Sequence, residues 1–129
     1  MESENHDMIK LMIALTLSLR EVTAESFHEY NTQPSVVYPY LTFDVSGEAI
    51  SRNVEGIYLD VDVFDNTGSY DRLFELETAL KAHFRDYRKM TDDLYIRCDY
   101  LRSNPVPTGD QNIKRRNIQF YVNTDWRTH

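Results

Sequence analysis

Three aspartates, Asp60, Asp62 and Asp65, stand close together in the sequence and could bind a hard metal cation through their carboxylate oxygens. Asp60 and Asp62 are two residues apart, so they share one face of an extended strand. A calcium loop of the EF-hand type would need a third ligand where Phe64 stands and a later bidentate glutamate, which is absent. We therefore interpret these carboxylates as a solvated acidic strand face and predict no metal site.

The other residues capable of acid-base or nucleophilic chemistry form no catalytic motif. Asp92 and Asp93 are adjacent, so in an extended chain their side chains would point to opposite faces and could not act as an acid-base pair. The sequence has neither a Gly-x-Ser-x-Gly motif nor a glycine-rich phosphate loop. The histidines have no metal-ligand spacing to one another or to the single cysteine; they are His6, His28, His83 and His129. We predict no catalytic residue, no cofactor and no enzymatic activity.

Composition is typical of a soluble protein with one domain. A hydrophobic share of 41% and an aromatic share of 12% exclude a disordered chain. No uncharged apolar run reaches the length of about 18 residues that spans a bilayer. With 129 residues the chain has the usual size of one domain, so one domain over residues 1–129 is predicted. Cys98 is the only cysteine and lies on an apolar strand face, which indicates a buried thiol in a reducing cytosol.

The charge of the chain, -7 overall, is unevenly distributed. Residues 102–116 carry four cations against one acid, a net charge of +3 that leaves -10 on the remainder; these five residues are Arg102, Lys114, Arg115, Arg116 and Asp110. The acidic balance disfavours a general nucleic-acid binder. Neighbouring cations repel one another unless an acidic surface is close. The asymmetry predicts that these five residues form a partner interface, either between copies or with another acidic surface.

A second candidate contact surface combines aromatic and charged residues on one face of the predicted strands. By parity they point away from the apolar face. Tyrosine supplies both contact area and hydrogen bonds, so such a face is typical of protein contact. An ordinary solvent-facing sheet with cross-strand pairs is the alternative. The residues are Tyr58, Asp60, Asp62, Tyr95, Asp99 and Tyr121.

Hydrophobic periodicity predicts the elements that position these residues. Apolar residues at three- and four-residue steps predict helices over Asp7–Arg20 and Ser69–Arg88. Alternation of apolar and polar residues predicts strands over Val37–Val45 and Ile57–Phe64. A short extended segment is predicted at Phe27–Tyr30.

The last third of the chain is predicted to be a long β-hairpin with arms Leu94–Ser103 and Ile113–Trp126, joined by the loop Asn104–Asp110. One face of each arm is apolar, and the same parity continues into Arg102 and Arg116 near the tip. The order of helix, strands, helix and hairpin predicts an α+β fold. We expect a largely antiparallel sheet with two helices packed on one of its faces.

Four segments carry a resemblance to a known family. They are Tyr38–Phe43, Gly56–Asp65, Leu101–Asp110 and Lys114–Val122. Their succession resembles the tail terminator proteins, also called tail completion or head-tail joining proteins, of long-tailed bacteriophages of Gram-positive bacteria. The resemblance extends from about residue 38 to residue 127, whereas the N-terminal helix agrees only in kind.

The resemblance implies a ring, usually a hexamer, that caps the tail tube, ends tail polymerisation and joins the tail to the head. Its partners would be its own copies, the tail tube protein and the head-completion or connector protein, with DNA passing through without specific binding and no membrane. It would be assembled in the bacterial host cytoplasm and lie at the head-proximal end of the virion tail. Two alternatives stay open: a head-completion or adaptor protein of the connector, and a small metal-dependent enzyme.

Overall fold

Four long strands form the centre of the molecule, and one short strand flanks them on each side. The computed structural model describes residues 2–49, 54–85, 87–90 and 94–126. The strands are β1 (Ser26–His28), β2 (Tyr40–Ala49), β3 (Val54–Asp65), β4 (Tyr87–Met90), β5 (Leu94–Val106) and β6 (Lys114–Trp126). Their order in the sheet is β1-β2-β3-β6-β5-β4, and every pairing is antiparallel except that of β1 with β2. The predicted, largely antiparallel sheet is confirmed.

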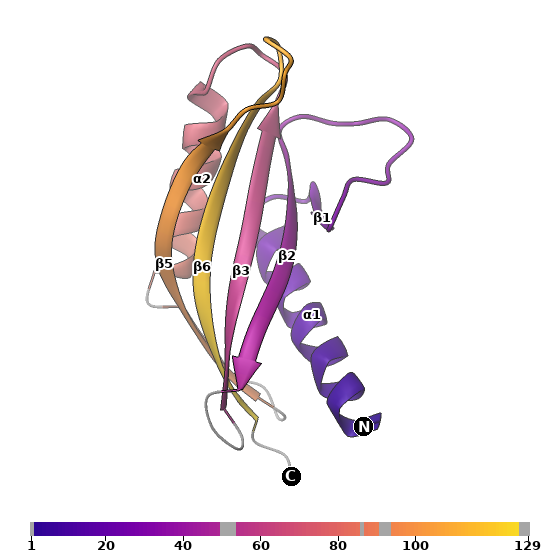
Figure 1. Ribbon diagram of the computed structural model, residues 1–129, viewed down its shortest axis with the longest axis vertical. Coiled ribbons are helices and arrows are strands. Elements are labelled where there is room, and N and C mark those ends of the chain that lie inside the picture. Colours follow the sequence, from indigo (N-terminus) through magenta and orange to yellow (C-terminus); the bar gives the residue numbers. More distant parts are fainter. Residues whose placement is uncertain (1, 50–53, 86, 91–93, 127–129) are drawn as a thin grey trace.

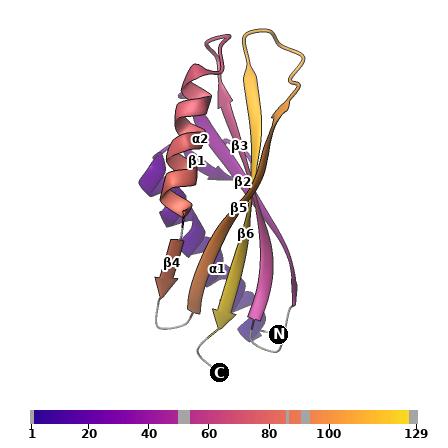
Figure 2. The same cartoon turned by 90° about the vertical axis from the view of Figure 1, so that its left-hand side faces the viewer.

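Two helices, α1 (Glu2–Val22) and α2 (Asp71–Phe84), cover the same face of this sheet (Figures 1 and 2). Each presents an apolar stripe to the sheet, because residues three and four positions apart lie on one side of a helix. Leu11, Leu15 and Leu19 of α1 are buried, as are Leu73 and Leu80 of α2. The predicted α+β fold with both helices on one face is therefore confirmed.

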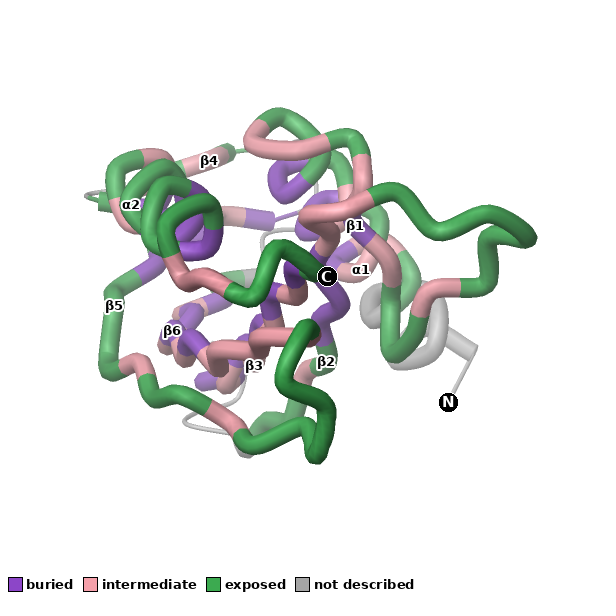
Figure 3. Tube along the Cα trace, turned by 90° about the horizontal axis from the view of Figure 1, so that it is seen from above, coloured by how far each residue is buried: buried purple, intermediate pink, exposed green. Residues whose placement is uncertain are grey.

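The core lies between the helices and the sheet, where Figure 3 shows the buried segments gathered. Alternate residues of each long strand point into it, for example Leu59 and Val61 of β3 and Phe120 of β6. Their neighbours along the strand point to the opposite face, which no described helix covers. The alternation of apolar residues in the sequence thus decides which face of the sheet is buried.

The second helix is shorter than predicted. It ends at Phe84, and Tyr87 and Arg88, which were predicted to be helical, belong instead to β4. Tyr87 fits the apolar pattern of a helix and also that of a strand. It lies on β4, yet the centre of its ring is 5.2 Å from that of Phe84. One apolar residue at a helical interval cannot distinguish the two arrangements. Tyr70 occupies the N-cap position, and the hydroxyl of Ser69, one residue earlier, accepts a hydrogen bond from Asp71 N at 3.1 Å.

A β-bulge reverses the parity of β5 near the hairpin tip, so the predicted position of Arg102 on the apolar face is wrong. Leu101 is an extra residue in β5 relative to its partner strand. Because of the extra residue, each side chain beyond it points to the face opposite the one that regular alternation would give. Ser103 therefore faces α2 and donates to Glu77 Oε2 at 3.0 Å. The Arg102 Nε donates to Gln119 Oε1 at 2.8 Å on the other face.

The hairpin is also longer than predicted, because residues 104–106 continue β5 and pair with residues 115–117 of β6. The connecting loop is therefore 107–113. Pro105 is tolerated because β5 is paired on only one side at this height. Asp92, Asp93 and His129 lie outside the described residues, as do the side chains of His6 and Trp126. Neither of the described helices is long and apolar enough to cross a membrane.

Candidate functional site

The six predicted contact residues share the sheet face opposite the helices, which we name the open face. Their neighbours along the strands, such as Leu59 and Val122, are buried beneath the helices. Tyr58 and Tyr121 are cross-strand partners, and their rings pack edge to face with their centres 5.2 Å apart. The six are Tyr58, Asp60 and Asp62 on β3, Tyr95 and Asp99 on β5, and Tyr121 on β6. The structure thus brings them to one surface; their role in contact stays a prediction.

Two of the three aspartates on the open face, Asp60 and Asp62, accept hydrogen bonds from side chains of β6. Asp60 Oδ1 accepts a hydrogen bond from Gln119 Nε2 at 3.1 Å. Asp62 accepts one from Arg115 Nε at 3.2 Å and another from Asn117 Nδ2 at 3.3 Å. Asp65, the third aspartate considered for a metal site, is fully buried. That these three carboxylates bind no metal stays a prediction.

Asp65 belongs to the boundary between β3 and α2. Its Oδ1 lies 2.7 Å from Arg72 Nη2 and also accepts a hydrogen bond from Asn66 N at 2.9 Å. A buried carboxylate is tolerated only when it is paired and hydrogen-bonded. Asp65 therefore anchors the first turn of α2 to the end of the strand.

Two of the three consecutive cations Lys114, Arg115 and Arg116 have acidic partners within the chain. Arg115 Nη2 lies 3.2 Å from Asp62 Oδ2, and Arg116 Nε lies 2.7 Å from Glu77 Oε1. Lys114 Nζ lies 5.4 Å from the centre of a tyrosine ring of the α2 N-terminus. Arg115 and Arg116 therefore need no acidic surface on another copy, and the interface role of the three cations stays a prediction.

Glu77 is the centre of this network and was missed by the sequence analysis. Its carboxylate is nearly buried and contacts Arg116, Lys81 at 2.9 Å and Ser103 at 3.0 Å. Burial alone would raise the pKa of Glu77, but the three hydrogen bonds hold this pKa below its ordinary value. The spacing of Glu77 and Lys81, four residues apart on a helix, was the only signal of this network in the sequence.

Asp110 shapes the hairpin loop rather than neutralising the basic residues. Its Oδ1 accepts a hydrogen bond from Asn112 N at 2.8 Å, and its carbonyl accepts one from Ile113 N at 3.2 Å. Within the described part of the chain it forms no ion pair with Lys114, Arg115 or Arg116. The loop therefore turns the carboxylate of Asp110 to its own backbone, and the predicted role of this residue in a partner interface stays a prediction.

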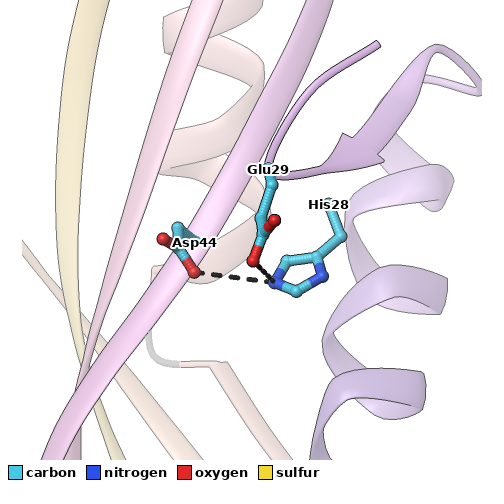
Figure 4. Close-up of side chains that lie close together, drawn as sticks. All are labelled: His28, Glu29 and Asp44. Carbon is cyan, nitrogen blue, oxygen red and sulfur yellow. Dashed lines mark ion pairs between the residues drawn. The ribbon is translucent and has the colours of Figure 1, made fainter. Parts of the chain in front are cut away.

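A further cluster lies at the β1–β2 edge of the sheet, where His28, Glu29 and Asp44 converge (Figure 4). The Nε2 of His28 lies 3.9 Å from Glu29 Oε1 and 3.5 Å from Asp44 Oδ1. All three side chains are exposed. Two carboxylates share one imidazole, so negative charge is in excess here whether or not the imidazole is protonated. Exposed acidic groups of this kind are common without a bound ion, and we assign no metal to them.

His83 contacts both a serine and a glutamate without forming a catalytic triad. Ser18 Oγ lies 3.0 Å from His83 Nε2, and Glu21 Oε2 lies 3.7 Å from the same nitrogen. In a triad the carboxylate would contact the other ring nitrogen, leaving Nε2 to take the serine proton. Ser18 is buried and also donates to the Tyr87 hydroxyl at 2.9 Å. The cluster therefore joins α1 to α2 and β4.

Cys98 is buried, as predicted from its position on an apolar strand face. Burial raises the pKa of its thiol to about 12, with a smaller contribution from the neighbouring Asp99. A thiol with such a pKa is almost entirely protonated at neutral pH and is a poor nucleophile. The residue contributes to packing in the core.

No protein-family model matches the chain. No curated protein matches it in sequence either. A chain in a solved structure described as the virion of a native gene transfer agent particle is similar to it, with a TM-score of 0.60 and 10% sequence identity. The likeness is one of fold. It covers 83% of this chain and 84% of that chain, so it extends over most of both chains rather than over one motif.

Proposed function

We propose that this chain is a structural protein of a tailed phage-type virion, in which it forms a ring that caps the tail tube, ends tube polymerisation and joins the tail to the head. The observation that carries the proposal is the likeness of fold to a virion chain over most of both chains. The resemblance of Tyr38–Asp65 and Leu101–Val122 to tail terminator proteins narrows the proposal to the head-proximal end of the tail.

The surfaces of the chain support a role in assembly rather than in catalysis. The open face exposes tyrosines beside charged groups, a combination typical of protein interfaces. Among the described residues, Ser18, His83 and Glu21 come nearest to a catalytic arrangement, but the glutamate lies near the same ring nitrogen as the serine and not near the other one. An acidic chain would also let DNA pass through a ring without binding it, because like charges repel.

Deleting the gene in the phage or phage-like element that encodes the chain tests the proposal. A tail terminator should leave tubes longer than normal and unattached to heads when particles are imaged by electron microscopy. Tails of normal length that fail to join heads would instead indicate a head-completion or adaptor protein. Particles of normal structure and number would contradict any role in the virion.

The purified protein provides a second test through its mass. Analytical ultracentrifugation, alone and with tails isolated from the deletion strain, should detect a ring in at least one setting. Electron microscopy should then show that ring at the end of the tube. A monomer in both settings would contradict the proposal.

A further inference from the structure

The sheet has two edges that are each covered over only part of their length. On one side, β1 pairs with residues 41–43 of β2 and leaves residues 44–49 without a partner among the described strands. On the other side, β4 pairs with residues 95–98 of β5 and leaves residues 99–106 without one. Unpaired strand edges expose backbone donors and acceptors that favour pairing with another chain.

The two short strands occupy opposite ends of their edges. Through the registers of the sheet, Leu41 lies in one row with Val63, Arg116 and Pro105. Gly47 of β2 is likewise connected through its register partners on β3 and β6 to Cys98 of β5. The short strand β1 therefore lies level with the unpaired part of β5, and β4 lies level with the unpaired part of β2.

Two copies in the same orientation can therefore share one additional strand position between them. In that position β1 of one copy would lie beside residues 103–105 of the next, and β4 of the next would lie beside residues 47–49 of the first. Because β2, β3, β6 and β5 alternate in direction, β1 would run antiparallel to β5 of the next copy. The sheet would then continue from copy to copy without a reversal.

The charges at the two edges are complementary between the level of β1 and the level of β4, where the position shared by the two copies holds neither short strand. Glu29 N donates to Phe43 O, which brings Glu29 level with the next residue of β2, Asp44. The row of Asp44 passes through β3 and β6 and ends at Arg102 of β5. The exposed carboxylates of Glu29 and Asp44 in Figure 4 are thus level with the exposed guanidinium of Arg102 on the opposite edge of the sheet.

We propose that the β1–β2 edge of one copy joins the β4–β5 edge of the next, with Arg102 of the second copy received by Glu29 and Asp44 of the first. This inference rests on the proposed function, since it names the contact that would build the ring. Such a contact joins two different surfaces, so it repeats head to tail and closes when the rotation between copies allows it.

The features of the β5 edge restrict which partner fits. The bulge at Leu101 and the missing N–H of Pro105 disfavour pairing with an arbitrary extended chain. A strand of three residues such as β1, placed beside residues 103–105, avoids the bulge and meets Pro105 only at its end. Exposed apolar side chains at both edges would gain burial in the contact; they are Met90, Tyr100 and Leu101 on one side and Ile9, Ile13 and Leu17 of α1 on the other.

A charge swap tests the contact. Asp44→Arg and Arg102→Glu should each weaken association of the purified protein by about tenfold or more, measured by sedimentation. The double variant D44R/R102E should recover most of the loss, because the pair is restored in reverse order. Glu75→Arg, an exposed reversal on α2, is the matched control and should associate like the unchanged chain. Circular dichroism of each variant verifies folding.

A crosslink tests the register independently of charge. Phe27 and Asn104 lie in one row but at opposite edges of the same chain. The double variant Phe27→Cys with Asn104→Cys should form a ladder of disulfide-linked multimers under mild oxidation, whereas either single variant should not. Buried Cys98 stays unreactive.

The outcomes separate this inference from the proposed function. Rings that form without a crosslink and are insensitive to both charge reversals would overturn the inference and leave the ring standing. A chain that stays monomeric alone and with tails would overturn both. Multimers that crosslink, together with rescue by the double reversal, establish the contact.

Discussion

At the scale of single residues, Glu77 of α2 holds the hairpin through an ion pair with Arg116 and a hydrogen bond from Ser103. Replacing it with glutamine removes the negative charge from a nearly buried site and leaves Arg116 without its ion-pair partner. We expect Glu77→Gln to lower the free energy of unfolding by about 3 kcal/mol at pH 7, as for other broken buried pairs. Urea denaturation measures it, and Glu75→Gln on the exposed side of the same helix is the control.

The same residue predicts how stability depends on pH. The folded pKa of Glu77 is lower than its ordinary value of 4.5, so its stabilising contribution is complete above that value. The contribution is lost as the pH falls through the lower, folded pKa. The difference in unfolding free energy between the wild type and Glu77→Gln should therefore shrink on acidification below pH 4.5. A difference that stays constant from pH 7 to pH 3 would show that packing, rather than charge, is responsible.

At the scale of elements, the bulge of β5 decides which side chains of the hairpin tip face α2. Deleting Ser103 would remove the bulge by placing Leu101 opposite Gln119 and Arg102 opposite Ile118, while Asn104 keeps its partner in β6. The hydrogen bond to Glu77 would be lost, and Arg102 would be forced toward α2. We expect a loss of about 2–4 kcal/mol in unfolding free energy, because a hydrogen bond is lost and a charge is moved toward the core.

Deletion of Leu101 provides a comparison for the same change in chain length, because it removes the bulge and leaves Arg102 opposite Gln119 and Ser103 opposite Ile118. It should cost less than about 1 kcal/mol, since Leu101 is exposed and has no partner in β6. Equal losses in the two deletion variants, measured by thermal denaturation, would mean that the faces of Arg102 and Ser103 do not decide the stability of the hairpin.

Much of this arrangement followed from the sequence, and the exceptions have physical reasons. Apolar alternation at Leu59, Val61 and Val63 predicted the buried face, because a strand with one buried face tolerates no slip in register. The bulge was missed because the residues around Leu101 are exposed and carry no apolar pattern. The ion pair of Glu77 with Arg116 was missed because the residues are far apart in the chain and only the fold brings them together.

At the scale of the whole molecule, α1 is apolar on two sides. Leu15 points into the core, whereas Ile13 and Leu17 remain more than half exposed on the opposite side. A helix that is apolar on two sides is typical of an element buried between two bodies. In the free chain, Ile13→Ser should therefore cost well under the roughly 2–5 kcal/mol expected for Leu15→Ala. A similar loss in both variants would mean that the outer side of α1 is already covered.

The proposed contact between copies also predicts how the stability of the entire molecule depends on concentration. Association of folded chains stabilises them by mass action, so a tenfold rise in concentration above the dissociation constant should raise the melting temperature by about 4 °C. Asp44→Arg should abolish this dependence, since it removes one carboxylate from the site that receives Arg102. The reversed pair D44R/R102E should restore it, and Glu75→Arg should leave it unchanged. Scanning calorimetry over a hundredfold range, roughly 1–100 µM, measures the effect. A melting temperature independent of concentration in a sample that contains rings would mean that the edges of the sheet contribute little to their stability, which contradicts the proposed contact.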